Sequence, residues 1–425
     1  MSGSLLEFYR EHVQEVILPF WKKAVDKKKG GIYTCFNNEG DKLLNTNKYT
    51  WSQGRFIWLW SEVVRMIGEG KLEGDRKNYL ANLHKSIDFV EENVFLENGN
   101  CVYLLAEDGQ KKKSSHSEVY DSSIYADCFI ALGLAKYAHL TRNSERFAKV
   151  VELYTRIRER IKKGTFKTEP YPIPAGYKAH AIPMIMLNLS QEMAETAQDL
   201  QHPFADTLLR YSLEYMKEIM EGFCDENDRI IEILPEDQSK GVETILNRHL
   251  NPGHAIESMW FVLHTAEREG VPKYTRQAVK AIEYAIRIGW DKYYGGLLRF
   301  SDLGGGKPRG QKEGHAYEKL ITDSWDMKLW WPHAEALYAT LLAYDITGDQ
   351  AIFDLYKKIE RYVFDVFPNP DTEIGEWIQI RDRKGIPIDE IAALPVKDPF
   401  HILRSLLLII DLLESKQESN SDIEH

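Results

Sequence analysis

Apolar side chains recur at helical spacing along almost the whole chain of 425 residues, and this periodicity constrains the fold more than any other feature. Apolar residues at positions i, i+3, i+4 and i+7 indicate a helix with a buried face. Strand-like alternation is confined to short pieces next to glycine and proline. The sequence therefore predicts a helical protein. We expect twelve helices, at residues 4–27, 50–68, 74–94, 121–140, 143–162, 176–198, 203–221, 253–269, 272–289, 326–346, 349–366 and 399–414.

Polar helix starts recur along the chain at a nearly constant interval of 58 to 79 residues, counted from Arg55, Ser122, His180, His254, His333 and His401. Repetition on this scale is typical of folds in which one supersecondary unit recurs. We therefore expect an all-α fold in which six helical hairpins close into a ring, as a single domain over residues 1–414. Residues 415–425 are polar, lack aromatic side chains and are predicted to be a disordered tail.

Four short segments between the helices resemble β-hairpins. In each of them β-branched and aromatic residues alternate with polar ones and a glycine or a polar residue stands near the turn. The segments cover residues 30–40, 229–234, 295–300 and 376–385. We expect them to form short β-hairpin loops at one mouth of the helical ring.

Charge and composition exclude several classes of protein. The 54 basic and 65 acidic side chains give a formal net charge of −11, and the basic ones are not clustered, so we expect no nucleic-acid partner. Apolar runs are shorter than the ~20 residues that span a bilayer, and the first residues lack a signal-peptide core. We expect a cytoplasmic protein that does not enter the membrane. The four cysteines show no CxxC spacing, so neither a disulfide framework nor a zinc cluster is predicted.

Aromatic residues make up 12 % of the chain and include ten tryptophans. Aromatic side chains often line carbohydrate clefts, because the apolar faces of sugar rings stack on aromatic rings. A large helical core is the alternative explanation.

The segment RHLNPGHAIESMW at residues 248–260 carries the strongest candidates for chemistry. If Pro252 opens a helix, His254 lies in the first turn and Glu257 lies beside it, three residues on. A carboxylate can orient an imidazole and raise its basicity, as a general base requires. An ordinary helix start with a satisfied polar pair is the alternative. The same pair could ligate a metal, but no further ligand stands at a recognisable spacing, so no metal is predicted.

Two further residues could complete such a site. His401 stands at the start of a very apolar helix and would supply a second titrating group on the other side of a substrate. Arg55 follows Trp51 by one turn on an aromatic helix face, and a buried cation needs an anion or a strong acceptor. A developing enolate oxygen would serve, as would a carboxylate in a structural salt bridge.

Other polar and aromatic residues near helix starts are candidates for contacts with sugar hydroxyls and sugar faces, or else for core and capping positions. They are Tyr49, Trp51, Lys328, Trp330, Glu376 and Trp377, with His333 the one most readily explained by structure alone. Two motifs fail. The LGGGKP run at residues 303–308 lacks the earlier glycine and the following hydroxyl residue of a phosphate-binding loop, and the chain holds no GxSxG elbow.

With these segments identified, the chain resembles the N-acylglucosamine 2-epimerase family, which includes the vertebrate renin-binding proteins and is related to the cellobiose 2-epimerases. The resemblance rests on six motifs in the same order along the chain. They are GGIYTCF at 30–36, KYTWSQGR at 48–55, NPGHAIE at 251–257, KLWWPHAE at 328–335, GEW at 375–377 and FH at 400–401.

The resemblance implies an (α/α)6 barrel with its active site at one mouth. It implies that His254 and His401 are the acid–base pair, one removing the proton at C2 of the open-chain sugar and the other returning it to the opposite face. Arg55 would then stabilise the enolate oxygen, and Glu257 would hold His254. It also implies that ATP can serve as an activator rather than a reactant, and that a homodimer is common.

These implications leave several functions open. Cellobiose 2-epimerases and aldose–ketose isomerases resemble this chain but carry an additional histidine, at whose position Ile185 stands here. We therefore expect an epimerase that interconverts N-acetylglucosamine and N-acetylmannosamine. An aldose–ketose isomerase of the mannose–fructose type, with His180 as a substitute, is the first alternative. A glycoside hydrolase using two of Glu257, Glu335 and Glu376 and a non-catalytic sugar-binding barrel are the others. For the epimerase, we expect activity to fall as the pH drops through the histidine range.

Overall fold

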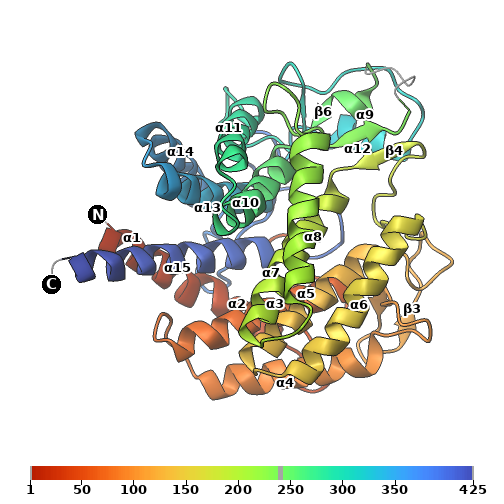
Figure 1. Ribbon diagram of the computed structural model, residues 1–425, viewed down its shortest axis with the longest axis vertical. Coiled ribbons are helices and arrows are strands. Elements are labelled where there is room, and N and C mark those ends of the chain that lie inside the picture. The colour runs from red at the N-terminus through yellow and green to blue at the C-terminus, as the bar shows by residue number, and fades with distance from the viewer. Residues whose placement is uncertain (1, 238–242, 424–425) are drawn as a thin grey trace.

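The structure is a computed structural model that describes residues 2–237 and 243–423. Its helices form two concentric layers (Figure 1). Each inner helix is followed along the chain by its outer partner, except for the last. The inner helices are α3 (Thr50–Gly68), α5 (Ile124–Leu140), α7 (Ala181–Asp199), α10 (Pro252–Arg268), α13 (Trp330–Thr347) and α15 (Phe400–Ile423). The outer helices are α4 (Arg76–Asn93), α6 (Ser144–Lys163), α8 (Ala205–Glu218), which η2 (Ile219–Phe223) extends, α11 (Pro272–Gly289) and α14 (Gln350–Val366).

The ring closes through the two ends of the chain. Inner helices contact one another in the order α3, α5, α7, α10, α13, α15, and α15 contacts α3 again. The outer partner of α15 comes from the other end of the sequence, as α1 (Ser2–Glu11) and α2 (Leu18–Ala24) joined by the π-helical turn η1 (His12–Ile17). Figure 1 shows α1 beside α15. All twelve predicted helices and the (α/α)6 barrel are therefore confirmed.

Apolar periodicity explains the two layers. Inner helices such as α5 and α13 are apolar on every side and are buried on every side. Outer helices such as α11 bury one face and expose the other. Two glycines let α3 and α5 approach with backbones in contact, because a Cβ at Gly54 would lie 2.3 Å from the Phe129 carbonyl oxygen and one at Gly133 would lie 2.3 Å from the Gly54 carbonyl oxygen.

Short antiparallel strands link the start of four helical hairpins to their ends, and one further pair forms a local hairpin. The strand before an inner helix pairs with the strand after the following outer helix. The pairs are β1 (Lys48–Tyr49) with β2 (Leu104–Leu105), β4 (Tyr177–Ala179) with β5 (Ile233–Pro235), β6 (His249–Leu250) with β7 (Ser301–Asp302) and β8 (Lys328–Leu329) with β9 (Ile380–Arg381), and β2 also pairs with β3 (Lys111–Lys112).

The four predicted hairpin segments therefore differ from the expectation in their partners. Segment 229–234 contributes a strand that pairs with β4, far back in the sequence, and segment 376–385 pairs in the same way with β8. Around segments 30–40 and 295–300 the glycine turns are closed by single bridges, such as Val25 with Ile32 and Trp290 with Leu297.

A small lobe, here called the cap, covers one mouth of the barrel. It consists of β4, β5 and two short helices that the sequence did not predict, α9 (Ile245–Arg248) and α12 (Ala316–Ser324). The first is a single turn, and the second has nine residues with only one apolar turn in an otherwise polar segment. The cap has its own small core, formed by Tyr177, Ala179, Ile233, Ile245, Leu246, Phe300 and Ile321.

The C-terminal end of the chain differs from the prediction. Helix α15 continues to Ile423 instead of ending at Glu414, so this part of the predicted disordered tail is helical, and the last two residues lie outside the described part. Lys416 pairs with Asp345 of α13 at 2.5 Å, which gives the polar extension an anchor on the barrel.

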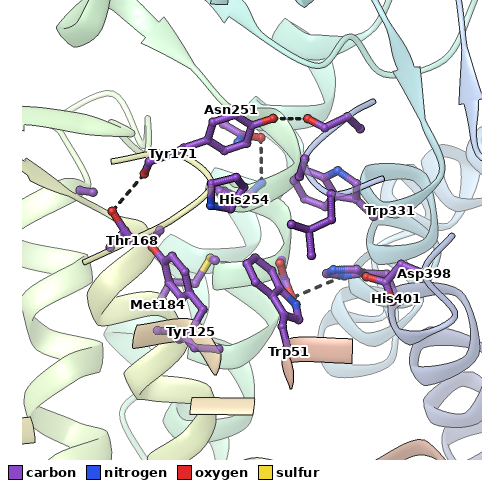
Figure 2. A pocket seen from close by; sticks show the side chains of 18 of the residues that line it. Trp51, Tyr125, Thr168, Tyr171, Met184, Asn251, His254, Trp331, Asp398 and His401 are labelled. Carbon is purple, nitrogen blue, oxygen red and sulfur yellow. Dashed lines mark hydrogen bonds and ion pairs between the residues drawn. The ribbon is translucent and has the colours of Figure 1, made fainter. Parts of the chain in front are cut away.

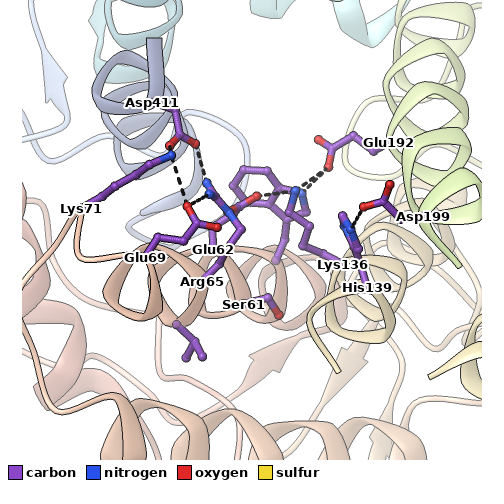
Figure 3. A network of polar contacts seen from close by, with 12 residues as sticks. Ser61, Glu62, Arg65, Glu69, Lys71, Lys136, His139, Glu192, Asp199 and Asp411 are labelled. Carbon is purple, nitrogen blue, oxygen red and sulfur yellow. Dashed lines mark hydrogen bonds and ion pairs between the residues drawn. The ribbon is translucent and has the colours of Figure 1, made fainter. Parts of the chain in front are cut away.

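A network of charged side chains ties the inner helices together below their N-terminal turns (Figure 3). Lys136 of α5 pairs with Glu62 of α3 and with Glu192 of α7. Arg65 of α3 pairs with Asp411 of α15. Burial raises the pKa of Glu62, but the two neighbouring cations outweigh it and lower that pKa to about 2. Within the described residues, no helix is both long enough and apolar enough to cross a bilayer.

Candidate active site

A cavity of about 220 Å³ lies where the inner helices begin, beneath the cap. The lining is mostly apolar and aromatic, with a few polar groups converging on it, as is usual for small-molecule sites. Tyr317 and Leu320 of α12 line it from the cap side. Each inner helix contributes at least one side chain, among them Arg55, Phe129, Asn188, His254, Trp331 and His401. Figure 2 shows His254 and His401 on different walls of this cavity.

His254 is held by a buried carboxylate. It lies in the first turn of α10, where Asn251 caps the helix by accepting the His254 backbone N–H at 3.2 Å. The imidazole Nδ1 lies 2.7 Å from Oε1 of Glu232. Burial alone would lower the pKa of His254, but the charge of Glu232 and the hydrogen bond to it outweigh burial and raise that pKa above its ordinary value. With Nδ1 bonded to Glu232, Nε2 is the nitrogen available to a substrate.

A second histidine stands behind Glu232. His180 is fully buried, its Nδ1 lies 3.7 Å from Oε2 of Glu232, and its Nε2 lies 3.0 Å from the Ser258 hydroxyl. It does not line the cavity. His180 therefore packs against the carboxylate that holds His254 and is not positioned to touch a substrate.

His401 occupies the opposite kind of environment. Its side chain is 9 % exposed, against 26 % for His254, and its Nδ1 lies 2.6 Å from Oε1 of Glu335. The same Glu335 oxygen accepts a hydrogen bond from Arg404 at 2.7 Å. Burial lowers the pKa of His401 to about 3. The negative charge of Glu257 opposes this shift, and the positive charge of Arg55 adds to it. His401 is therefore a neutral imidazole at neutral pH.

Arg55 is buried against three aromatic rings beside His401. Its guanidinium carbon lies 4.8 Å from the ring centroid of Trp51 and 4.1 Å from that of Phe129. One terminal nitrogen pairs with Asp398 and the other lies 3.3 Å from Nε2 of His401. The arginine thus keeps a positive charge next to the reactive nitrogen of His401, which is where a developing oxyanion would be stabilised.

Trp331 connects the two histidines. Its ring centroid lies 5.2 Å from that of His254 and 5.5 Å from that of His401 (Figure 2). A flat substrate fragment next to this indole would lie within reach of both imidazoles. The cavity therefore combines a neutral imidazole, an imidazole with a raised pKa and an aromatic platform, which is what proton removal and return at one carbon requires.

The prediction that Glu257 holds His254 is wrong. Glu257 accepts a hydrogen bond from Arg404 and lies 3.7 Å from Nδ1 of His401, whereas Glu232 holds His254. The three-residue spacing does place Glu257 and His254 on one helix face, and both line the cavity. The pairing of β5 with β4 brings Glu232 close to His254 from a distant segment of the chain. Glu232, and not Glu257, is therefore the carboxylate that bonds to Nδ1 of His254.

The predicted substrate contacts divide into two groups. Trp51 and Trp330 line the cavity, and their contact with a sugar stays a prediction. Tyr49, Lys328, Glu376 and Trp377 do not line it.

Three of these four residues make buried structural contacts outside the cavity. Lys328 is fully buried, donates to the Gly295 carbonyl oxygen and lies 3.5 Å from Asp291, so it holds the glycine turn after α11. Glu376 pairs with Lys397 at 2.7 Å, and the Trp377 indole N–H donates to His12 at 2.8 Å.

The remaining two candidates are structural as well. Tyr49 packs edge-on against Tyr103, with ring centroids 5.6 Å apart. His333 is fully buried, accepts the Leu297 backbone N–H at 2.8 Å and lies 2.6 Å from the Leu329 carbonyl oxygen through Nδ1, which agrees with its structural interpretation.

Sequence reasoning missed several residues of the site, namely Glu232, Trp331, Glu335 as the partner of His401, Arg404, Asp398 and Asn188. Two of them carry a signal in the sequence. Glu232 is the single charge between isoleucines in the strand segment RIIEIL, and Arg404 is the single charge in the apolar run FHILRSLLLII. A charge in such a run needs a buried partner, which the structure supplies.

Glu257, Glu335 and His401 offer three ligand atoms within 4.8 Å of one another, a grouping that suits a metal ion. Arg404 already binds both carboxylates with one terminal nitrogen, at 2.7 Å from Glu335 and in direct contact with Glu257. The neighbouring carboxylates raise the pKa of Arg404, although its burial opposes this, so the guanidinium supplies the positive charge at this position.

Comparison with known proteins agrees with this architecture. The sequence model of the N-acylglucosamine 2-epimerase family matches residues 31–405. The human N-acylglucosamine 2-epimerase is 28 % identical over 422 residues, covering 96 % of this chain and 91 % of the human protein. Solved structures with the same fold include the following two. A cellobiose 2-epimerase from Bacillus thermoamylovorans is 19 % identical with a TM-score of 0.76, over 96 % of this chain and 100 % of the other.

A D-mannose isomerase is 16 % identical with a TM-score of 0.74, over 96 % of this chain and 98 % of the other. Likeness at this identity establishes the fold alone, whereas the family match spans nearly the whole chain. The chain therefore belongs to the N-acylglucosamine 2-epimerase family.

Proposed function

We propose that this protein interconverts N-acetylglucosamine and N-acetylmannosamine by removing the proton at C2 of the open-chain sugar and returning it to the opposite face. The observation that carries the proposal is the pair of cavity histidines, each with Nδ1 bound to a buried carboxylate and with pKa shifts of opposite sign. Such a pair holds one proton between its members over a wide pH range, as deprotonation on one face and protonation on the other require.

The proton transfers follow from these protonation states. Neutral His401 accepts the C2 proton at Nε2, and the electron pair of the broken C–H bond forms an enolate with its charge on the C1 oxygen. Protonated His254 donates from Nε2 to the other face of C2, and the C1 carbonyl forms again with C2 inverted. The forward reaction leaves the proton on His401 and leaves His254 neutral, so His401 releases its proton to water and His254 takes one from water before the next turnover. The reverse reaction uses the same two nitrogens in exchanged roles.

The surrounding charges support each step. Glu232 stabilises the positive charge of His254. Arg55 lies 3.3 Å from Nε2 of His401 and places positive charge where the enolate forms. Trp331, packed against both imidazoles, offers a face on which the open-chain sugar can lie.

Two alternative functions make different demands on the cavity. An aldose–ketose isomerase with His180 as an additional acid or base would need that residue in the cavity, yet it packs behind Glu232. A glycoside hydrolase needs two carboxyl groups flanking the scissile bond. Of the candidates, Glu257 and Glu335 bind Arg404, and Glu376 pairs with Lys397 away from the cavity. Both arrangements favour the epimerase.

The test is proton NMR of the purified protein in D2O with N-acetylmannosamine and, separately, with mannose. We expect N-acetylglucosamine with deuterium at C2. Fructose formed from mannose, with the N-acetyl sugar unchanged, would contradict the proposal and assign the isomerase reaction instead. Unchanged sugars in both samples would also contradict it.

Two finer statements that come from the family resemblance remain proposals. We propose that ATP raises the rate without being consumed, so each assay is run with and without ATP and the nucleotide is followed by phosphorus NMR. We also propose a homodimer, which sedimentation of the full chain tests.

A further inference from the structure

Asn188 lies deepest among the α7 residues that line the cavity. Ala181, Met184, Ile185 and Asn188 face it together, at the spacing of one helix face. Because α7 begins at the mouth and rises 1.5 Å per residue, Asn188 stands about 10 Å from its first residue. The side chain is therefore part of the cavity floor, and Asn188 is 1 % exposed.

The amide of Asn188 has no bonding partner in the part of the chain that the structure describes. Neither Nδ2 nor Oδ1 makes a hydrogen bond, although both are buried. Leaving a buried amide unpaired is unfavourable. The two arginines of the same floor bind carboxylates, Arg55 with Asp398 and Arg404 with Glu257 and Glu335. Asn188 thus offers both a donor and an acceptor that the protein itself does not use.

The α7 side chains next to this amide, and the deepest cavity side chains of the neighbouring helices, are apolar, and the two guanidiniums over those rings already bind carboxylates. Met184 and Ile185 precede it on α7, and the deepest cavity residues of the two neighbouring inner helices are Phe129 of α5 and Phe261 of α10. A hydroxyl-rich part of a sugar would leave hydroxyls unpaired among such side chains. An acylamino group fits better, because it combines one amide with an apolar methyl or longer acyl chain.

In the proposed reaction, one substituent of C2 would face this floor. If His254 and His401 approach C2 from opposite faces, the bonds from C2 to C1, to C3 and to nitrogen lie in the plane between them while the enolate exists. The helices α10 and α15, which carry the two histidines, begin at the mouth of the cavity and extend towards its floor. The plane that contains these three bonds would therefore also extend from the mouth to the floor.

We propose that Asn188 is a specificity-determining residue that binds the C2 acylamino group of the substrate. Its Nδ2 donates to the acyl carbonyl oxygen, and the acyl methyl packs on Ile185, Met184 and Phe261. The inference rests on the proposed function, since it assumes a sugar whose C2 lies between the two histidines. It adds the group by which the cavity distinguishes an N-acyl sugar from a sugar with a hydroxyl at C2.

The test uses Asn188→Leu, which keeps the approximate shape and removes the amide, and Asn188→Ala as a second variant in case the first packs poorly. We expect kcat/KM for N-acetylmannosamine to fall about 10- to 100-fold in both, in line with the loss of one buried hydrogen bond. Deuterium exchange at C2 of mannose, measured over long incubations at high protein concentration, should change less than about threefold. A matched control is Ser190→Ala on the same helix, which is buried, bonds to Tyr154 and does not line the cavity.

Binding of unreactive ligands gives a readout that does not depend on turnover. We expect N-acetylglucosaminitol to bind the wild-type protein more tightly than glucitol in calorimetry, and this preference to disappear in Asn188→Leu but not in Ser190→Ala. A preference that survives in Asn188→Leu, or equal losses for both sugars, would overturn the inference while the wild-type protein still epimerises. A wild-type protein that does not epimerise would instead contradict the proposed function.

Discussion

The two histidine walls of the cavity carry the same pair of groups and differ in what surrounds them. On α10, His254 binds Glu232, whose carboxylate is within ion-pair distance of a second imidazole and of no arginine that the structure describes. On α15, Nδ1 of His401 binds Glu335, and Glu335 also binds Arg404. A second arginine, Arg55, lies next to Nε2 of His401. The pKa of His254 is raised and that of His401 falls to about 3.

The difference shows that a hydrogen-bonded carboxylate does not by itself make a histidine basic. A carboxylate raises an imidazole pKa through its uncompensated negative charge. Arg404 compensates the charge of Glu335, and the burial of His401 then decides the outcome. One residue type thus serves as acid on one wall and as base on the other.

The largest expected effect comes from removing either histidine. His254→Gln and His401→Gln should each lower the rate of epimerisation by about a thousandfold, because each removes a proton-transfer group. Exchange of the C2 proton with deuterium from D2O distinguishes the roles of the two histidines. In His254→Gln the neutral His401 should still exchange the C2 proton of one epimer with D2O without inverting it, as NMR of each epimer would show.

The converse variant makes the comparison sharper. In His401→Gln we expect exchange of the other epimer only, and only as the pH rises above the raised pKa of His254. Both variants exchanging the same epimer, or exchange in His401→Gln that is already complete at pH 5, would mean that the roles are assigned to the wrong walls.

An intermediate effect should follow from neutralising Glu232. Epimerisation needs one protonated and one neutral imidazole, so kcat/KM should fall at high pH as His254 loses its proton and at low pH as His401 gains one. The pKa of about 3 for His401 places the acid limb well below the ordinary histidine range, contrary to the sequence-based expectation. Glu232→Gln removes the charge that raises the pKa of His254, so the alkaline limb should move to lower pH and the rate at pH 8 should fall about tenfold.

Glu257→Gln is the matched control for this variant, because Glu257 lines the same cavity but bonds to Arg404. Its alkaline limb should move less than that of Glu232→Gln. If instead Glu257→Gln moves the limb as far and Glu232→Gln leaves it in place, then Glu257 holds His254 in solution.

The smallest effect on activity is expected at Glu376. This residue is fully buried and pairs with Lys397 outside the cavity. Glu376→Gln leaves Lys397 without its counter-charge, so the free energy of unfolding should fall by about 3–5 kcal/mol. The rate at 25 °C should change less than twofold in protein that remains folded. A large loss of activity without loss of stability would place Glu376 at the chemistry and revive the hydrolase alternative.

The fold was predictable because the apolar period is local and repeats along the chain. Apolar residues on every side of a helix predict that it is buried in the inner layer. The recurring helix starts indicate a closed ring. The cap was not predictable in the same way. Its strand β5 pairs with β4 across a whole helical hairpin, and α12 shows only one apolar turn, formed by Tyr317, Leu320 and Ile321, in an otherwise polar segment.

The candidate site was predictable where a residue stands at a helix start that faces the cavity, as His254 and His401 do. It was not predictable where a distant segment supplies the partner, as with Glu232 and His254. Lys328 lies in the same motif as the cavity residues Trp330 and Trp331, yet it contacts the glycine turn after α11, because motif membership does not fix the direction of a side chain.

The most direct test of the account is nitrogen-15 NMR of the imidazoles in protein labelled at histidine, with His254→Gln and His401→Gln used to assign the two signals. We predict a His401 that is neutral at pH 7 and whose signal does not titrate between pH 5 and 8, and a His254 whose pKa lies above the ordinary value of about 6.5. A His401 that titrates in the ordinary range, or a His254 that is neutral at pH 6, would contradict the division of roles between the two walls.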